Sequence, residues 1–314
     1  MQTILITGGT GLVGKALTDT LVEKGYNVIV LTRGLAGKGS SPGVSYALWD
    51  VKKQSIDLEA IRSADHIVHL AGAGVVEKKW TPAYQKEIVD SRVDSSALLL
   101  QALKDHPNNV SSIISASAIG WYGEDQEPLP AHGGFKETDP PDHGFLGETC
   151  RLWESSIEPA ALLGKRVVKL RTGIVLSNDG GAFREFKKPL RFGVAAILGN
   201  GKQVISWIHV DDLCRMFIYA IENKNIDGSY NAVGPNPVTN KTFMLRLAKI
   251  ARGKFFIALH VPRFVLNIMM GKRSIEVLKS TTVSCEKISS AGYEFLYPEI
   301  GDALEQLLQP TGQR

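Results

Sequence analysis

The chain has little cysteine and no long apolar run. Its 314 residues include three cysteines, which lie far apart at Cys150, Cys214 and Cys285. Their spacing fits neither a metal site nor a disulfide framework, so we predict free thiols in a reducing compartment and no metal. No apolar stretch approaches the ~20 residues that cross a bilayer, and the first expected strand leaves no room for a leader peptide. These features predict a cytoplasmic protein with no membrane partner.

The chain also lacks an excess of charge of either sign. Lysine and arginine number 36 against 32 acidic residues, a formal net charge of +4. The lysine pairs are scattered and not interleaved with stacking aromatics, so we expect no nucleic-acid partner. Anionic small molecules remain plausible ligands. The length predicts one main domain with an appendage.

The most informative segment that is present is a glycine-rich turn near the N-terminus. An apolar run at residues 4–6 predicts a buried strand, and residues 15–24 predict a helix. Between them lies Gly-x-Gly-x-x-Gly, the context in which this pattern indicates a dinucleotide site rather than a plain turn. Such glycines permit close approach of a pyrophosphate, and the helix start offers it free N–H groups. The predicted contacts here are Gly8, Thr10, Gly11, Leu12, Val13 and Gly14.

Alternating patterns in the N-terminal half predict the fold class. Expected strands at residues 28–31, 45–48, 66–70, 112–115 and 167–170 are separated by expected helices at 57–62, 81–104 and 149–163. This order predicts an α/β protein with a Rossmann-type, doubly wound parallel sheet. Ligands of such sheets bind beyond the carboxyl ends of the strands. Leu70, Ala71, Gly72 and Ser115 occupy such ends and are therefore predicted to contact the cofactor.

The second half of the chain is less regular and predicts a smaller, mixed α/β lobe. We assign residues 1–172 to an NADP(H)-binding domain, with elements returning around 204–233, and residues 173–314 to a substrate lobe with a C-terminal helical extension. Helices are expected there at 241–252, 262–270 and 302–308. Residues 123–144 predict a long functional loop over the site. It carries His132 and His143, which are either proton carriers or plain surface residues.

The residues after the second expected strand indicate which cofactor binds. An NAD site places an acidic residue there for the ribose hydroxyls, whereas this chain has Thr32 and Arg33. A guanidinium can bind a 2′-phosphate through paired, charge-assisted hydrogen bonds, so we predict NADP(H). The alternative is that Arg33 is a surface arginine. Asp50 either accepts from the adenine amino group or is a turn residue.

Several motifs are spread along nearly the whole chain, at Thr7 to Gly14, His69 to Gly72, Lys79 to Thr81, Ser91-Arg92, Ser115 to Ser117, Gly120 to Gly123, Leu170 to Gly173, Trp207 to Asp212 and Val261-Pro262. They resemble those of the extended short-chain dehydrogenase/reductase superfamily, and more narrowly its nucleoside-diphosphate-sugar epimerase-like subgroup, which has a short C-terminal domain of unknown role. The resemblance implies a small-molecule substrate, with sugar nucleotides among the candidates, and a homodimer paired through the helix at 81–104.

The chain departs from this superfamily at the catalytic pair. Members use a serine, a tyrosine and a lysine four residues after the tyrosine, but here Leu146 and Cys150 stand at the last two positions. Neither can replace a phenol whose proton moves under the influence of an ammonium group. Ser117 matches the family serine, and Tyr122 offers a phenol from another direction. The alternatives are a serine that satisfies backbone groups and a tyrosine that packs.

Other polar residues admit two interpretations each. Arg92 either orients a substrate anion or ties a helix to loop carbonyls. The cluster of Lys187, Lys188 and Arg191 either meets substrate phosphates or is a solvated helix face, and Asp211 is expected to cap a helix. Trp80 and Trp207 either wall a pocket or fill the core.

The sequence therefore predicts an NADP(H)-dependent oxidoreductase or epimerase with a non-standard catalytic site. The alternative is a catalytically silent NADP(H)-binding redox sensor or regulatory protein.

Overall fold

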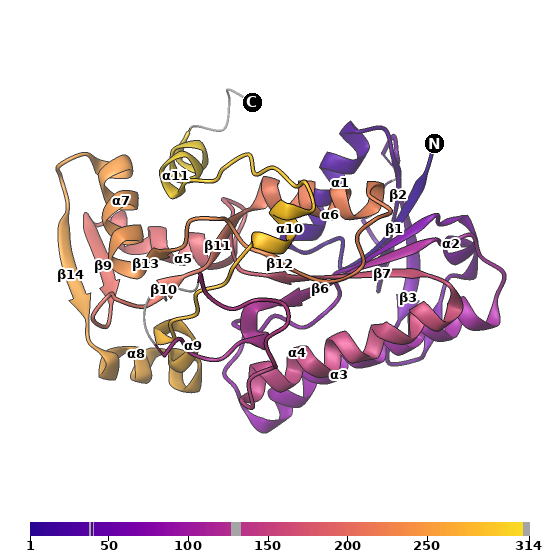
Figure 1. Ribbon diagram of the computed structural model, residues 1–314, viewed down its shortest axis with the longest axis horizontal. Coiled ribbons are helices and arrows are strands. Elements are labelled where there is room, and N and C mark those ends of the chain that lie inside the picture. Colours follow the sequence, from indigo (N-terminus) through magenta and orange to yellow (C-terminus); the bar gives the residue numbers. More distant parts are fainter. Residues whose placement is uncertain (38, 40, 127–132, 310–314) are drawn as a thin grey trace.

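A twisted sheet of eight strands forms the centre of the molecule. The computed structural model describes residues 1–37, 39, 41–126 and 133–309 (Figure 1). The strand order is β12-β7-β6-β5-β1-β2-β3-β4, and all neighbours pair in parallel except β3 and β4. The strands are β1 (Thr3–Thr7), β2 (Asn27–Thr32), β3 (Val44–Asp50), β4 (Ser55–Ile56), β5 (His66–His69), β6 (Ser112–Ala118), β7 (Arg166–Thr172) and β12 (Gly228–Ala232).

This order confirms the predicted Rossmann-type fold. The chain runs from β1 outward through β2 and β3, then returns to the other side of β1 and runs outward through β5, β6 and β7. The reversal lies between β1 and β5, where open α/β sheets form a crevice beyond the carboxyl ends of their strands.

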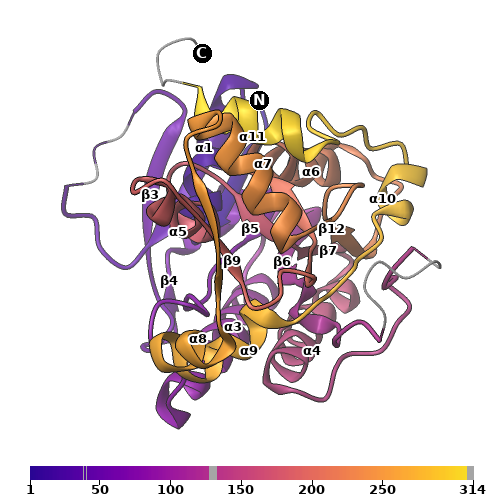
Figure 2. The same ribbon diagram turned by 90° about the vertical axis from the view of Figure 1, so that its left-hand side faces the viewer.

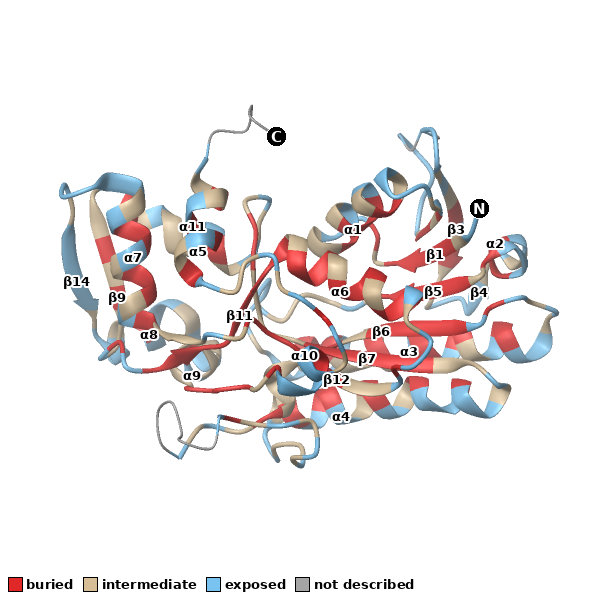
Figure 3. Cartoon of the chain, turned by 45° about the horizontal axis from the view of Figure 1, so that its top comes forward, coloured by how far each residue is buried: buried red, intermediate tan, exposed pale blue. Residues whose placement is uncertain are grey.

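Helices cover both faces of the sheet, and the strands between them are buried (Figure 3). One face carries α1 (Leu12–Glu23) and α6 (Val210–Glu222), which share a core with Ile4, Ile6 and Ile114. The other face carries α2 (Leu58–Ser63), α3 (Pro82–Asp105) and α4 (Phe145–Ile157), followed by the 3₁₀ helix η2 (Glu158–Leu163). Apolar side chains thus alternate between two separate cores along each strand.

The helices begin where local chemistry favours a start. The Thr81 hydroxyl accepts from the Tyr84 N–H at 3.2 Å, and Pro82 occupies the first turn of α3. Asp57 caps α2 in the same way. The expected bounds agree within a few residues, except that α4 begins at Phe145, four residues before the expected start.

A smaller lobe has a core of its own around Phe183, Trp207 and Phe243. Trp207 therefore fills the core rather than walling a pocket. Three short sheets and several helices build this lobe, at the left of Figure 1. The pairs are β8 (Ile174–Leu176) with β11 (Trp207–His209), β9 (Val194–Leu198) with β14 (Ile257–Val261), and β10 (Val204–Ile205) with β13 (Val238–Thr239); the helices are α5 (Gly181–Leu190), α7 (Asn240–Arg252), α8 (Arg263–Met270), α9 (Ser274–Leu278) and α11 (Ile300–Leu308). The short helix α10 (Glu286–Ser290) instead packs beside β12 of the large sheet (Figure 1).

Two aspartates, one in the loop after β6 and one in α6, bind the C-terminal segment through hydrogen bonds. Asp125, after β6, accepts hydrogen bonds from the Thr282 N–H at 2.8 Å and from the Ser280 hydroxyl at 2.8 Å. Asp212, fully buried in α6, accepts from the N–H groups of Leu296 and Tyr297 at 2.6 and 2.9 Å. The C-terminal segment is consequently part of the frame that positions the loop after β6.

One expected cap is wrong. The residue that caps α6 is His209, whose Nδ1 accepts from the Asp211 N–H at 3.1 Å. Asp211 lies inside the first turn, where its charge favours the positive end of the helix. Among the described helices, none combines the length and apolar character needed to cross a membrane.

Candidate functional site

The β1–α1 turn is built so that only glycine fits at two of its positions. Gly8 has a φ of +69°, and a Cβ there would lie 2.8 Å from the backbone carbon of Leu70. A Cβ on Gly14 would lie 2.3 Å from the Gly8 carbonyl oxygen. The turn and the helix therefore pack backbone against backbone, as the glycine pattern predicted.

The turn leaves the start of α1 open to an anion. The helix begins after Gly11, with no side-chain cap and no acidic residue in its first turn, so the first N–H groups remain available. A Cβ on Gly11 would approach only the Gly8 oxygen, at 3.3 Å, and Gly11 is exposed together with Thr10. Leu12 and Val13 are half-buried beside them. These residues fit the diphosphate of a dinucleotide.

The predicted cofactor residues of β2 and β3 lie at the same edge of the sheet. Arg33 follows the end of β2 and is exposed, and no described residue makes a hydrogen bond or an ion pair with it. The Thr32 hydroxyl donates to the Gly34 carbonyl at 3.2 Å. Asp50 accepts from the N–H groups of Lys52 and Lys53 at 3.0 and 3.2 Å, so of its two interpretations the turn residue is the one observed.

A buried threonine and histidine hold the end of β5 against the glycine turn. The Thr7 hydroxyl accepts from the N–H groups of Leu70 and Ala71, both at 3.1 Å. It also lies 2.7 Å from Nδ1 of His69. Ser115 pairs in register with His69, the last residue of β5, so it lies level with the end of that strand. Strand β6 continues beyond it to Ala118.

Arg92 ties a helix to loop carbonyls, the second of its two interpretations. Its guanidinium donates to the carbonyl oxygens of Ala73 and Ile88 at 3.0 and 2.8 Å, and it lies 4.6 Å from the ring of Trp153. A Cβ on Gly72 would lie 3.0 Å from the Arg92 Cζ. Gly72 therefore lets the loop after β5 lie flat on this arginine.

Ser117 and Tyr122 belong to one buried polar network. The Ser117 hydroxyl donates to the Glu154 carboxylate at 2.7 Å. The Arg171 guanidinium donates to both oxygens of the same carboxylate, at 2.8 and 3.0 Å. The Tyr122 hydroxyl donates to Asn231 at 2.6 Å and accepts from Arg171 at 3.0 Å. All five residues are at most 3% exposed. Arg171 also stacks on Trp121, with its Cζ 3.6 Å from the ring centroid.

Burial keeps the Tyr122 phenol neutral within this network. Burial raises its pKa to about 12, against the opposing effect of the neighbouring Arg171. Cys150, at the position of the family lysine, is no substitute, because burial raises the pKa of its thiol to about 12 as well. Leu146 packs closely against Gly120. The hydrogen bonds favour a structural role for both hydroxyls, and the catalytic role of Ser117 and Tyr122 stays a prediction.

Two lysines of the predicted phosphate-binding cluster already have protein partners. Lys187 donates to Asn178 at 2.6 Å, and Lys188 pairs with Glu185 at 2.7 Å, which matches the interpretation as a helix surface. Trp80 meets the Phe145 ring edge-on, with centroids 5.0 Å apart. His143 is exposed, and His132 lies outside the described residues.

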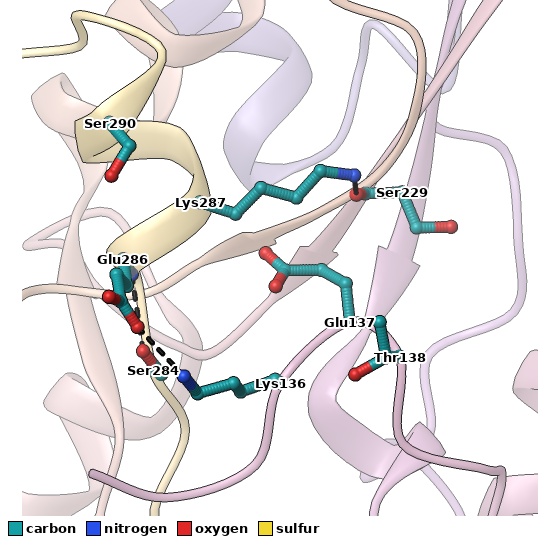
Figure 4. Close-up of a pocket in the computed structure, with 8 residues that line it drawn as sticks. All are labelled: Lys136, Glu137, Thr138, Ser229, Ser284, Glu286, Lys287 and Ser290. Carbon is teal, nitrogen blue, oxygen red and sulfur yellow. Dashed lines mark hydrogen bonds and ion pairs between the residues drawn. The ribbon is translucent and has the colours of Figure 1, made fainter.

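Two cavities lie near the loop that follows β6. One, of about 540 Å³, borders the edge strand β12 and is lined by Lys136, Glu137, Ser229, Glu286 and Lys287, among others (Figure 4). Its cations are already engaged, since Lys136 pairs with Glu286 at 2.9 Å and Lys287 donates to the Ser229 carbonyl at 2.8 Å.

The other cavity, of about 240 Å³, lies between that loop and helices α8 and α9. Its lining includes Arg263 and Lys279, which the sequence did not single out. Their spacing in the sequence could not have indicated this site, because only the tertiary fold brings them to the same cavity as Glu124.

Comparison with known proteins identifies the family. Residues 4–144 match the model of the NAD dependent epimerase/dehydratase family, and residues 261–307 match a domain of unknown function, DUF1731. The epimerase family protein SH2119 of Staphylococcus haemolyticus is 32% identical over 98% of this chain and 99% of its own length. The chain belongs to this epimerase family, with its NAD(P)-binding fold.

Two solved structures share the fold along nearly the whole chain. The human epimerase family protein SDR39U1, solved with NADPH, has a TM-score of 0.84 and 28% identity, with 98% of this chain and 99% of that one covered. A nucleoside-diphosphate sugar epimerase from Corynebacterium glutamicum has a TM-score of 0.74 and 31% identity, with 98% of this chain and 58% of that one covered.

Proposed function

We propose that this protein is an NADP(H)-dependent oxidoreductase or epimerase-like enzyme that acts on a small polar substrate. The observation that carries the proposal is the exposed Arg33 at the carboxyl end of β2, where an NAD site has an acidic residue. The NADPH bound to the human relative supports the same choice of cofactor. The relatives named for sugar nucleotides make these compounds the first substrates to test.

Each part of the sheet edge has a task in this proposal. The β1–α1 turn from Gly8 to Gly14 binds the diphosphate, and Thr32 with Arg33 binds the 2′-phosphate. The backbone from Leu70 to Gly72 and the Ser115 region shape the edge beside them. When bound, the nicotinamide supplies hydride exchange, and the protein supplies orientation.

The cofactor assignment is tested by replacing Arg33 with alanine. Losing paired, charge-assisted hydrogen bonds to a phosphate weakens NADPH binding by about 10- to 100-fold and leaves NADH binding unchanged. Fluorescence titration of both cofactors measures this, with Arg246→Ala as the control because Arg246 is an exposed arginine on α7. Equal loss of affinity for both cofactors, or none for either, contradicts the assignment.

A second candidate, a catalytically silent NADP(H)-binding sensor, is favoured by one observation. The hydroxyls of Ser117 and Tyr122 are buried and hydrogen-bonded, and Leu146 and Cys150 replace the proton-transfer pair. Absorbance of NADPH followed with a panel of carbonyl compounds and sugar nucleotides separates the two functions. Turnover supports the enzyme, whereas tight NADPH binding with no turnover of any compound supports the sensor.

A further inference from the structure

The cavity beside Glu124 is lined by residues of α8, α9 and the loop that follows β6. Helices α8 and α9 lie next to each other below β9 in both ribbon views (Figures 1 and 2). Arg273, between them, donates to the Val76 carbonyl at 2.5 Å, which ties these helices to the loop after β5. Lys279 donates to the Tyr122 carbonyl at 2.7 Å, which ties them to the loop after β6. Helices α8 and α9, which line the cavity, are therefore held against the loops that follow two neighbouring strands, β5 and β6.

The polar groups of this cavity are chiefly hydrogen-bond donors. Arg263 and Asn267 are four residues apart on α8, so they share one face of the helix. No described residue forms a hydrogen bond or an ion pair with the Arg263 guanidinium. The Asn267 oxygen is used by the Ser274 hydroxyl at 2.6 Å, which leaves its NH₂ group. Lys279 keeps further donors, since an ammonium group has three.

Two carboxylates lie near these donors. Glu124 is exposed at the rim, lines the same cavity and has no ion pair with a described residue. Glu276 forms an ion pair with the Lys279 ammonium group at 4.0 Å, which offsets part of its charge. The site thus offers a ligand the guanidinium of Arg263 and the amide of Asn267, with the ammonium group of Lys279 beside them and the Glu124 carboxylate available to a hydroxyl.

We propose that this cavity binds the anionic end of the substrate, a phosphate or carboxylate group on a small hydroxylated molecule, through Arg263 and Lys279. The inference rests on the proposed function, since it names the substrate class of that site. The volume limits the ligand, because about 240 Å³ is below the ~300–1,000 Å³ of sites that enclose drug-sized molecules. Ile275 and Leu278 form the apolar wall against which the carbon skeleton packs.

The test uses the whole protein saturated with NADPH, so that the glycine-rich turn cannot bind the probes. Inorganic phosphate and malonate, each against potassium chloride at equal ionic strength, are titrated by calorimetry. Tighter binding of phosphate identifies a phosphorylated substrate, and tighter binding of malonate identifies a carboxylated one. Arg263→Gln weakens the preferred anion about 10-fold, the loss of one charge-assisted hydrogen bond. Glu124→Gln strengthens it, because a repelling charge is removed.

Arg246→Gln is the matched control, since it removes an equivalent exposed charge outside the cavity. Anion binding that Arg263→Gln and Arg246→Gln weaken equally is a general charge effect and overturns the inference. Binding that NADPH abolishes and Arg263→Gln leaves intact belongs to the glycine-rich turn and also overturns it. Failure of NADPH to bind contradicts the proposed function instead. The anion titrations are then carried out without NADPH, and Arg263→Gln should still weaken anion binding if the cavity is the site.

Discussion

Tyr122 has a hydroxyl that could take part in catalysis, but its hydrogen bonds give it a structural role. Its hydroxyl joins β12, through Asn231, to β7, through Arg171. Its ring stacks on Phe135, with centroids 5.2 Å apart. A substrate hydroxyl that replaced either partner would leave a buried polar group unsatisfied, at a cost of about 1–3 kcal/mol.

Tyr122→Phe therefore separates the two roles of this residue. If the role is structural, the free energy of unfolding falls by about 1–3 kcal/mol and NADPH affinity is unchanged. Urea denaturation and NADPH titration measure both quantities. Combined with Asn231→Ala, the substitution should show coupling in a double-mutant cycle, because the two side chains share a hydrogen bond. Loss of turnover at unchanged stability contradicts the structural role and supports the catalytic one.

The sequence allowed prediction of residues whose role follows from local spacing. The glycines of the turn are of this kind, because strand, turn and helix follow one another along the chain. The partners of Arg171 and Tyr122 are not, since Glu154, which binds Arg171, lies on a helix, and Asn231, which binds Tyr122, lies on a strand far along the chain. The cap of α6 was missed for another reason. Aspartate is a favoured cap, but His209 is the last residue with extended backbone, at φ −70° and ψ 143°.

At the scale of elements, the β1–α1 turn has two functions that different glycines perform. Gly14 permits the close packing of helix and strand, because a Cβ there would lie 2.5 Å from the Gly9 Cα. Gly11 lies at the exposed surface of the turn, where little protein is in contact.

Alanine at each position should therefore have different effects. Gly14→Ala lowers stability, because the backbone must shift to relieve the clash with Gly8. Gly11→Ala changes stability by less than about 1 kcal/mol and weakens NADPH binding, since its methyl group enters the space of the diphosphate. Thermal melts with and without NADPH measure both. Unchanged NADPH affinity in a folded Gly11→Ala protein contradicts the placement of the diphosphate.

The alternation of elements made the large sheet predictable, whereas the smaller lobe was harder to foresee. Its strands are two to five residues long and pair between distant segments, such as β9 with β14. Short strands lack the periodicity from which a pairing can be inferred. The cavity between α8, α9 and the loop after β6 depends on that packing, so the sequence could not indicate it.

At the scale of the whole molecule, buried histidines link stability to pH. His69 is fully buried, and burial lowers its pKa to about 4, with a further lowering by nearby Arg92. Between pH 6.5 and 4 the unfolded chain binds a proton that the folded protein does not. Stability is therefore complete above pH 6.5 and is lost as the pH falls, by up to about 3 kcal/mol. His66, whose pKa burial also lowers, acts in the same direction.

Urea denaturation at pH 7, 5.5 and 4.5 measures this loss. His69→Gln should flatten the dependence, although it lowers stability at pH 7 through its altered contacts. His143→Gln, a change at an exposed loop histidine, should leave the dependence as it is. If the His69→Gln protein lost stability on acidification as steeply as the parent, this histidine would not be the cause.

The aspartate at position 125 has a consequence for biosynthesis. It follows β6, yet the groups that donate to it belong to residues 280–282, which leave the ribosome after all eight strands of the sheet. Until then the Asp125 carboxylate has none of these partners, and the loop after β6 lacks the hydrogen bonds that hold it in place. Folding during translation can therefore finish the sheet early, whereas the wall of the ligand cavity is completed only when synthesis is nearly over.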